Sequence, residues 1–174
     1  TQSAGVLSAK SLEATAATGI GTAANPIQTQ VDGLVFNNGT TGGVAVTNDG
    51  ALTVGGQNAG ASPVTLVADS GDLTIGADVD SGDEVSLVAS SGNIVYAAGT
   101  VSASHLSLSA GGTNGSIGAG DAVMTDVGQL EFTANGTGAV ELVEANGAAI
   151  SGTAGSGNVA VTSTTGDLEI GGDI

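Results

Sequence analysis

Four acidic side chains crowd into one short stretch, GADVDSGDEV at residues 76–85. They are Asp78, Asp80, Asp83 and Glu84. Calcium takes about six to eight oxygen ligands, often from Asp at alternating positions, and Gly82 would permit a sharp bend. The EF-hand pattern is not met, because Gly82 stands at its fifth position and the Glu at its twelfth position is absent. Two interpretations stay open: a calcium site formed by the four acids, or a solvated turn whose acids discourage sheet-to-sheet association.

Groups for covalent or acid–base catalysis are sparse. The chain has one His, His105, and no Cys, so a nucleophile with an adjacent base is not expected. A glycosidase needs two carboxylates, and Glu141 and Glu169 occupy outward positions of predicted strands, near equivalent corners of successive repeats. The aromatic platforms typical of glycan clefts are missing, since both Phe residues fall at inward positions. We therefore expect no enzyme activity, and we interpret the outward Glu side chains as solvating charge.

Composition excludes several classes of partner. One Lys or Arg stands against 17 Asp and Glu, which gives a formal net charge of -16. Neutralising phosphates requires basic side chains, so nucleic-acid binding is excluded and docking to anionic membranes is disfavoured. The sequence contains no long apolar run that predicts membrane insertion. Without Cys, neither disulfides nor thiolate metal sites are possible.

The elements that carry these residues repeat along the chain. Six stretches share an apolar-x-apolar start, a polar segment with Gly, and a second aliphatic group. They begin at Val44, Val64, Val85, Leu106, Val140 and Val159. Successive starts lie 20, 21, 21, 34 and 19 residues apart. A longer offset of 96 residues also aligns residues 27–44 with residues 123–140. A period near 20 residues is typical of solenoid architectures.

Each repeat predicts short strands. Alternation with period two specifies a strand with one buried face, and Val, Ile and Thr favour strands of about three to five residues. Gly at near-fixed positions, including Gly50, Gly71, Gly92, Gly147 and Gly166, supplies the corners. One repeat cannot bury its aliphatic face alone, but stacked copies bury continuous columns of Val, Leu and Ile. The sequence therefore predicts an all-β, parallel β-helix of about eight coils over residues 1–174, a single uncapped repeat segment.

Two long stretches carry a family resemblance. TGIGTAANPIQTQVDGL with GGVAVTNDGALTVGG, and SGDLTIGADVDSGDEVSLVASSGNIVYAAG, resemble the shaft repeats of filamentous-haemagglutinin-type exoproteins. The resemblance implies a right-handed parallel β-helix, secretion by a Gram-negative bacterium through an outer-membrane pore, and a role in adhesion or surface structure. Asn25-Pro26 is followed by Ile-Gln rather than the Asn-Leu-Gly type of the secretion domain, so the resemblance places this segment in the shaft.

From these observations we expect a structural shaft segment of a large secreted or surface-displayed adhesin-like protein, which either spaces other parts of that protein or forms part of a filament. Expected partners are neighbouring coils, other copies stacked end to end, and a host or cell-surface glycan or protein receptor. No cofactor is expected other than calcium, should the four acids bind it. Two rival functions stay open: a glycan-binding or carbohydrate-active module, and a calcium-stabilised solenoid. Asn38, Asn114 and Asn135 match the glycosylation acceptor pattern, but Asn-Gly is also the favoured pair for tight turns.

Overall fold

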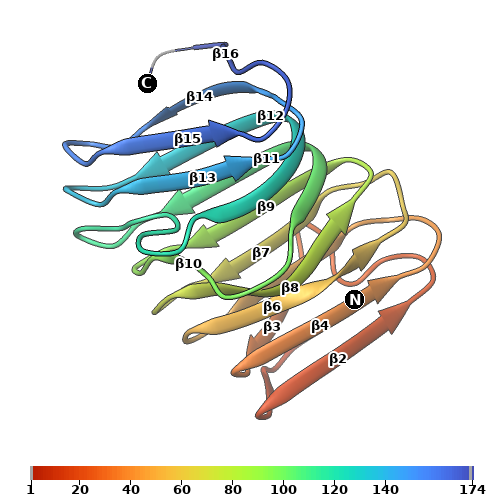
Figure 1. Ribbon diagram of the computed structural model, residues 1–174. Coiled ribbons are helices and arrows are strands. Elements are labelled where there is room, and N and C mark those ends of the chain that lie inside the picture. Colours follow the sequence, from red (N-terminus) through yellow and green to blue (C-terminus); the bar gives the residue numbers. More distant parts are fainter. Residues whose placement is uncertain (1, 173) are drawn as a thin grey trace.

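The computed structural model describes residues 2–172 and 174, and sixteen parallel-paired strands coil through it (Figure 1). The strands are β1 (Leu7–Ser8), β2 (Ser11–Ala16), β3 (Ile27–Gln30), β4 (Gly33–Asn38), β5 (Val44–Asn48), β6 (Leu52–Asn58), β7 (Val64–Ala68), β8 (Leu73–Ser81), β9 (Glu84–Ala89), β10 (Ile94–Tyr96), β11 (Val101–Ala110), β12 (Val123–Ala134), β13 (Val140–Glu144), β14 (Ala149–Thr153), β15 (Val159–Ser163) and β16 (Glu169–Ile170). The described part of the chain has no helix long and apolar enough to cross a membrane.

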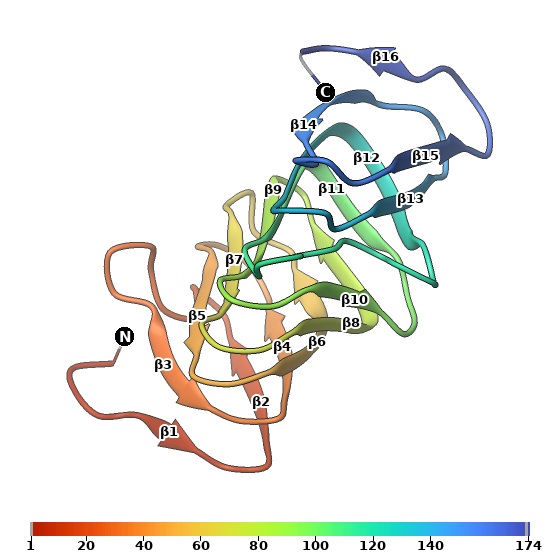
Figure 2. The same cartoon turned by 90° about the vertical axis from the view of Figure 1, so that its left-hand side faces the viewer.

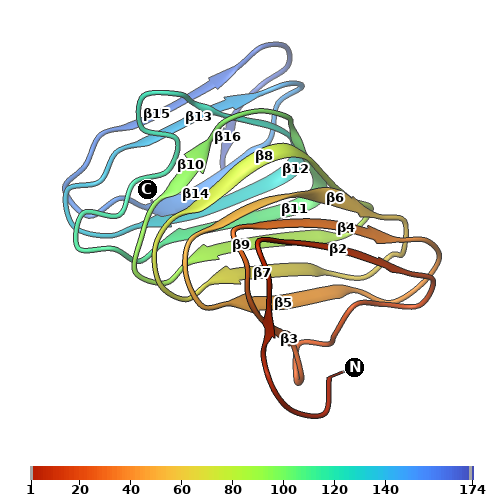
Figure 3. The ribbon, with the colours of Figure 1, turned by 90° about the horizontal axis from the view of Figure 1, so that it is seen from below.

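The strands stack into a parallel β-solenoid of about 8 turns, spaced by about 21 residues, which confirms the predicted architecture. In Figure 2 the stack runs from β1 and β2 at its lower end to β15 and β16 at its upper end. Figure 3 views it from the N-terminal side, with β2 in front and later coils behind. At about 4.8 Å per coil, eight coils span roughly 40 Å.

The core consists of aliphatic columns that run along the stack. One column joins strands through the paired residues Ile20, Val44, Val64, Val85, Leu106, Leu130, Ile150 and Ile170. A second contains Leu52, Leu73, Ile94, Ile117, Val140 and Val159. Most members are fully buried, and exposure returns only in the end coils. Each inner coil therefore buries its apolar face between its two neighbours, as the repeat pattern requires.

Two of the six aligned repeats lie on a different face from the one predicted. Val140 and Val159 join the second column, whereas Leu130 and Ile150 follow Leu106 in the first. The true spacings in the first column from Val44 to Ile170 are thus 20, 21, 21, 24, 20 and 20 residues. The apparent 34-residue gap between Leu106 and Val140 arises because these two residues lie near the start of strand segments on different faces. The first inward residue of both segments is aliphatic, so the sequence pattern does not distinguish them.

Some strands are longer than the predicted three to five residues, because they continue around a corner. In β11, Val101–Ala103 pair with one face of β12, and His105–Ala110 pair with both β9 and the following part of β12. The corner glycines behave as expected at four of the five predicted positions, where φ is positive. Gly92 is the exception: a Cβ there would lie 2.1 Å from the carbonyl oxygen of Gly71, so close stacking of the coils requires glycine.

Candidate functional site

The four clustered acids lie where β8 passes into β9, and their contacts join one coil to the next. Asp78 Oδ1 accepts a hydrogen bond from the N–H of Thr100 at 2.9 Å. The carbonyl of Asp83 accepts hydrogen bonds from the N–H groups of Ser104 and His105. Within residues 2–172 and 174, no group of three or more His, Cys, Asp or Glu side chains is placed to hold a metal ion. The observed contacts are those of a structural corner.

The pair of outward carboxylates proposed for glycoside chemistry is not brought together on one face. Glu141 lies on β13 and pairs with Ala160, whereas Glu169 lies on β16 and pairs with Ala149 in the other column of strands. The expectation that they occupy equivalent corners of successive coils is therefore wrong. It failed for the same reason as the repeat alignment, because β13 and β16 belong to different faces.

His105 lies on the outer surface of β11, where its strand partners are Glu84 on β9 and Gln129 on β12. Its Nε2 atom lies 3.9 Å from Glu131 Oε2, and the two side chains are 36% and 58% exposed. An exposed contact at this distance orients the imidazole only weakly.

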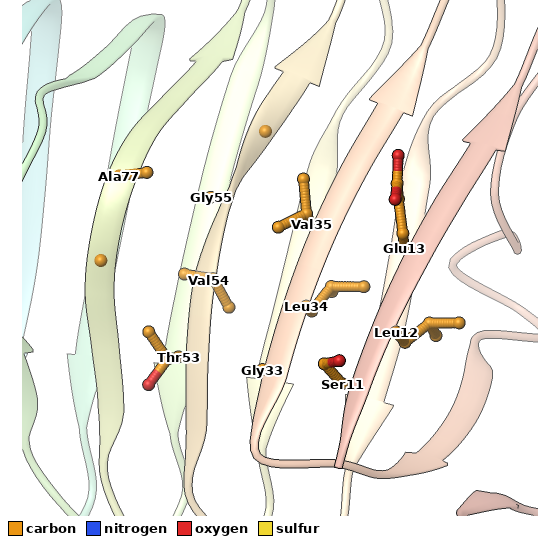
Figure 4. A pocket seen from close by; sticks show the side chains of 12 residues that line it. Ser11, Leu12, Glu13, Gly33, Leu34, Val35, Thr53, Val54, Gly55 and Ala77 are labelled. Atoms are coloured by element: carbon orange, nitrogen blue, oxygen red, sulfur yellow. The ribbon is translucent and has the colours of Figure 1, made fainter. Parts of the chain in front are cut away.

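One hollow on the outer surface crosses strands β2, β4, β6 and β8. It has a volume of about 510 Å³, and Gly33, Gly55 and Gly76 form much of its floor. Figure 4 shows that Val35 and Glu13 project at this surface, while Gly33 and Gly55 leave bare backbone. The period-two pattern places Gly33 and Gly55 at outward positions, but only the strand register shows that they lie on adjacent coils.

An adjoining hollow of about 380 Å³ carries the polar groups of the same surface. Asn37, Gln57, Asp78 and Asp80 line it, and Gln57 Nε2 donates to Asn37 Oδ1 at 3.5 Å. Together the two hollows form a shallow groove, hereafter the outer groove, with amide and carboxylate groups on one side. Such a surface offers hydrogen bonds to an extended polar polymer, but its described lining has no outward aromatic platform.

Two buried corners inside the solenoid have closely related polar contacts. In the first, hereafter the Asn48 corner, Asn48 Oδ1 accepts hydrogen bonds from Thr29 Oγ1 and from the N–H of Val31, both at 2.8 Å. In the second, the Glu144 corner, Glu144 Oε2 accepts a hydrogen bond from Thr125 Oγ1 at 2.5 Å. Glu144 Oε1 accepts from the N–H groups of Val127 and Asn146.

The contacts at these corners recur at the 96-residue offset seen in the sequence. Thr29 and Asn48 correspond to Thr125 and Glu144, and both Asn48 and Glu144 are 0% exposed. The two corners nevertheless lie on different faces of the solenoid. Thr29 belongs to the column of paired residues that continues through Asn48 and Ala68, whereas Thr125 belongs to the column that contains Val101. Sequence reasoning missed both corners, since their residues occupy inward positions where aliphatic side chains are expected.

One predicted glycosylation position has a structural role. Asn38 is 0% exposed, and its Nδ2 atom donates hydrogen bonds to the carbonyls of Thr41 and Gly42 and to Asn58 Oδ1. An attached glycan would require that nitrogen, which here is buried and bonds the loop that follows β4. Asn114 and Asn135 are exposed.

Comparisons with known proteins return nothing for this fold and these sites. No model of a known protein family matches the chain, and no match is found among curated proteins or solved structures.

Proposed function

We propose that this chain is a structural shaft segment of a large secreted or surface-displayed bacterial protein, adhesin-like and of the filamentous-haemagglutinin type. In this proposal it has no enzyme activity, and it holds other parts of the molecule at a fixed distance. The observation that supports it is the continuity of the buried columns, which pass through the coils without a break. A continuous core makes the coils one stiff body rather than a string of separate modules.

Load along the stack would be carried at each boundary between coils. The boundary between β11 and β12 alone aligns nine residue pairs in parallel register. Packed aliphatic side chains support the hydrogen bonds at these boundaries, because they keep water away from the inner face of each strand. The net charge of -16 keeps the outer surface solvated and discourages lateral association.

Force spectroscopy on single molecules tests this function. Since the chain has no Cys, Ser3→Cys and Gly172→Cys supply unique attachment points near the two ends. We expect little extension until coils detach, and then steps that each release about 70 Å of chain, the extended length of one 21-residue coil. Smooth extension at low force, without steps, would refute a load-bearing shaft.

A matched pair of core and surface variants sharpens the force experiment. Leu87→Ala removes a side chain that is 0% exposed at the centre of the stack, whereas Val88→Ala trims its outward-facing neighbour on β9. The shaft proposal predicts that Leu87→Ala lowers the force of the first step and that Val88→Ala leaves it nearly unchanged. Equal effects would mean that the columns do not carry the load.

The outer groove favours a second candidate, a glycan-binding face. Amide and carboxylate groups on adjacent coils could donate to and accept from successive sugar hydroxyls. A glycan array probed with the unmodified chain tests this candidate, with Asn37→Ala and Gln57→Ala as groove variants. Gln129→Ala, an exposed amide on β12, is the matched control. Absence of binding, or binding that the groove variants leave unchanged, would exclude it.

A further inference from the structure

Four Asn-Gly pairs in this chain have the chemistry to modify themselves. They begin at Asn38, Asn114, Asn135 and Asn146. In such a pair the backbone nitrogen of Gly can attack Cγ of the Asn side chain, because Gly has no Cβ to hinder the approach. The reaction needs an accessible Asn amide, a Gly N–H that is not held by an acceptor, and freedom to close a five-membered ring. The four pairs differ in these respects.

At Asn38 and Asn114 the attacking nitrogen is held by a backbone hydrogen bond. The N–H of the Gly after Asn38 donates to the carbonyl of Ala16 at 2.8 Å, and the N–H of the Gly after Asn114 donates to the carbonyl of Gly112 at 2.9 Å. Asn38 is itself buried, as is the Gly after Asn114. Thr137 Oγ1 also donates to Asn114 Oδ1 at 2.9 Å. Both pairs must therefore break a hydrogen bond before the ring can close.

At Asn146 the side chain is exposed but is fixed by its neighbours. Its Nδ2 atom donates to Asp126 Oδ1 at 2.6 Å, and its backbone N–H donates to Glu144 Oε1 at 3.4 Å. Gly147 is half-buried, and a Cβ there would lie 2.4 Å from the carbonyl oxygen of Asp167. Contacts with the coils on both sides thus oppose the movement that ring closure requires.

The pair at Asn135 has none of these restraints. Asn135 and Gly136 are both exposed, in the turn between β12 and β13. The N–H of Gly138 donates to the carbonyl of Asn135 at 3.4 Å, whereas the N–H of Gly136 has no acceptor within the part of the protein that the structure describes. Asn135 Nδ2 reaches the carbonyl of Gly111 at 3.4 Å, which is longer than the usual range, so the side chain is loosely held.

We propose that the folded chain modifies itself at Asn135 by deamidation. The nitrogen of Gly136 forms a bond to Asn135 Cγ, the bond between Cγ and Nδ2 breaks, and Nδ2 leaves as ammonia with the proton from the Gly136 N–H. Water then opens the resulting succinimide. Opening at one carbonyl gives aspartate, and opening at the other gives isoaspartate, in which the backbone continues through the former side chain. Either product adds one negative charge to the formal net charge of -16.

Isoaspartate at this turn disturbs contacts with the coils on both sides. A Cβ on Gly136 would lie 2.0 Å from the carbonyl oxygen of Thr113, and the carbonyl of Gly136 accepts a hydrogen bond from the N–H of Ser156 at 2.8 Å. The methylene group that isoaspartate adds to the backbone has no room in stacking this close. We therefore expect the amide of Ser156 to lose protection against hydrogen exchange in the modified chain.

Mass spectrometry of the unmodified folded chain, incubated at mildly alkaline pH, measures the conversion at each pair. Cleavage after the six Glu residues puts every pair on its own peptide, namely 14–84, 85–131, 132–141 and 145–169. We expect peptide 132–141 to gain the mass of an acid over an amide roughly tenfold faster than the others, a ratio of the order expected for opening one backbone hydrogen bond. In urea all four should convert at similar rates, because each Asn precedes Gly.

Equal rates in the folded chain, faster conversion at another pair, or no conversion at Asn135 while the unfolded chain converts would overturn the proposal. Asn135→Gln provides a second test, since attack on its longer side chain must close a less favourable six-membered ring. It should abolish the fast release of ammonia, whereas Asn114→Gln, the matched exposed control, should leave it unchanged. Equal effects of the two variants would contradict the assignment to Asn135. Should Asn135→Gln melt below the unmodified chain, Asn135→Ser replaces it.

Discussion

The Asn48 corner and the Glu144 corner solve one packing problem with different chemistry. At each corner, a buried side chain accepts one hydrogen bond from a Thr hydroxyl on the preceding coil. It accepts another from the backbone N–H of the Val that lies two residues after that Thr. Asn48 also donates, through Nδ2, to the carbonyls of Val31, Gly50 and Ala51. Glu144, by contrast, acts at its corner as an acceptor. The fold therefore fixes where a polar group is needed, and the local side chain decides how the backbone around it is satisfied.

A second feature recurs at the same offset and is unchanged. Phe36 pairs with Gly56, and Phe132 pairs with Gly152. A Cβ on Gly152 would lie 2.7 Å from the ring of Phe132, and one on Gly56 would lie 2.8 Å from the ring of Phe36. Each aromatic ring thus occupies space that a glycine on the next coil leaves free. The polar side chain differs between the Asn48 and Glu144 corners, whereas the packing of a Phe ring against a Gly is the same in both regions.

The largest effects are expected from removing the two rings. Phe36→Ala and Phe132→Ala each delete a side chain that is 1% exposed, which costs about 3–5 kcal/mol in the free energy of unfolding. We expect the larger loss of stability for Phe132→Ala, because β12 lies further inside the stack than β4. Strand β4 lies directly next to β2, the end strand of its face. Urea denaturation followed by circular dichroism measures both values. A larger loss for Phe36→Ala would contradict the view that the end coils are the less stable part.

Exchanging the polar chemistry of the corners separates them further. Asn48→Asp turns a carboxylate toward three carbonyl oxygens and is expected to cost about 3 kcal/mol, as for a buried charge without a partner. Glu144→Gln should cost below about 1 kcal/mol, because the amide oxygen still accepts from the backbone and the Thr125 hydroxyl can turn to accept from the new N–H. Thermal melts of the two variants at neutral pH test this asymmetry. Equal losses would mean that the donor contacts of Asn48 do not matter.

The Thr residues provide a smaller version of the same contrast. Thr125→Val removes the donor to Glu144 Oε2 and is expected to cost about 1–3 kcal/mol, because it leaves that buried oxygen without the Thr125 hydrogen bond. Thr29→Val should cost about 0.5–1.5 kcal/mol, since Asn48 Oδ1 keeps its bond from the N–H of Val31. Urea unfolding of both variants measures the two losses in the free energy of unfolding. A larger loss for Thr29→Val than for Thr125→Val would contradict the predicted contrast.

Much of this architecture could be predicted from sequence, but the assignment to faces could not. Alternation of Val and Leu correctly placed inward residues such as Leu66 and Leu87. It could not tell that Val140 follows Ile117 rather than Leu106, because every face of the solenoid has the same period of two. Ile117 itself lies outside any strand and joins its column through isolated bridges. The outer groove was missed because it arises from glycines on neighbouring coils, which only the register brings together.

The smallest effect is expected at the exposed acidic corner. Asp78→Asn retains an acceptor for the Thr100 N–H and should change the free energy of unfolding by less than about 0.5 kcal/mol. A calcium site formed by the four acids predicts instead that millimolar calcium raises the melting temperature of the unmodified chain and that Asp78→Asn weakens the rise. Melting curves recorded in calcium and in chelator decide between these two predictions, and we expect the two curves to coincide.

Native-state hydrogen exchange tests most directly that the coils form one continuous stack. We predict that amides in the buried strands β5–β9 and in β11 and β12 exchange slowest and lose protection together. Protection should fall toward β1 and β2 at one end and toward β15 and β16 at the other, because those strands have a neighbour on one side only. An inner strand such as β7 or β9 that exchanges as fast as the end coils would contradict a continuous shaft.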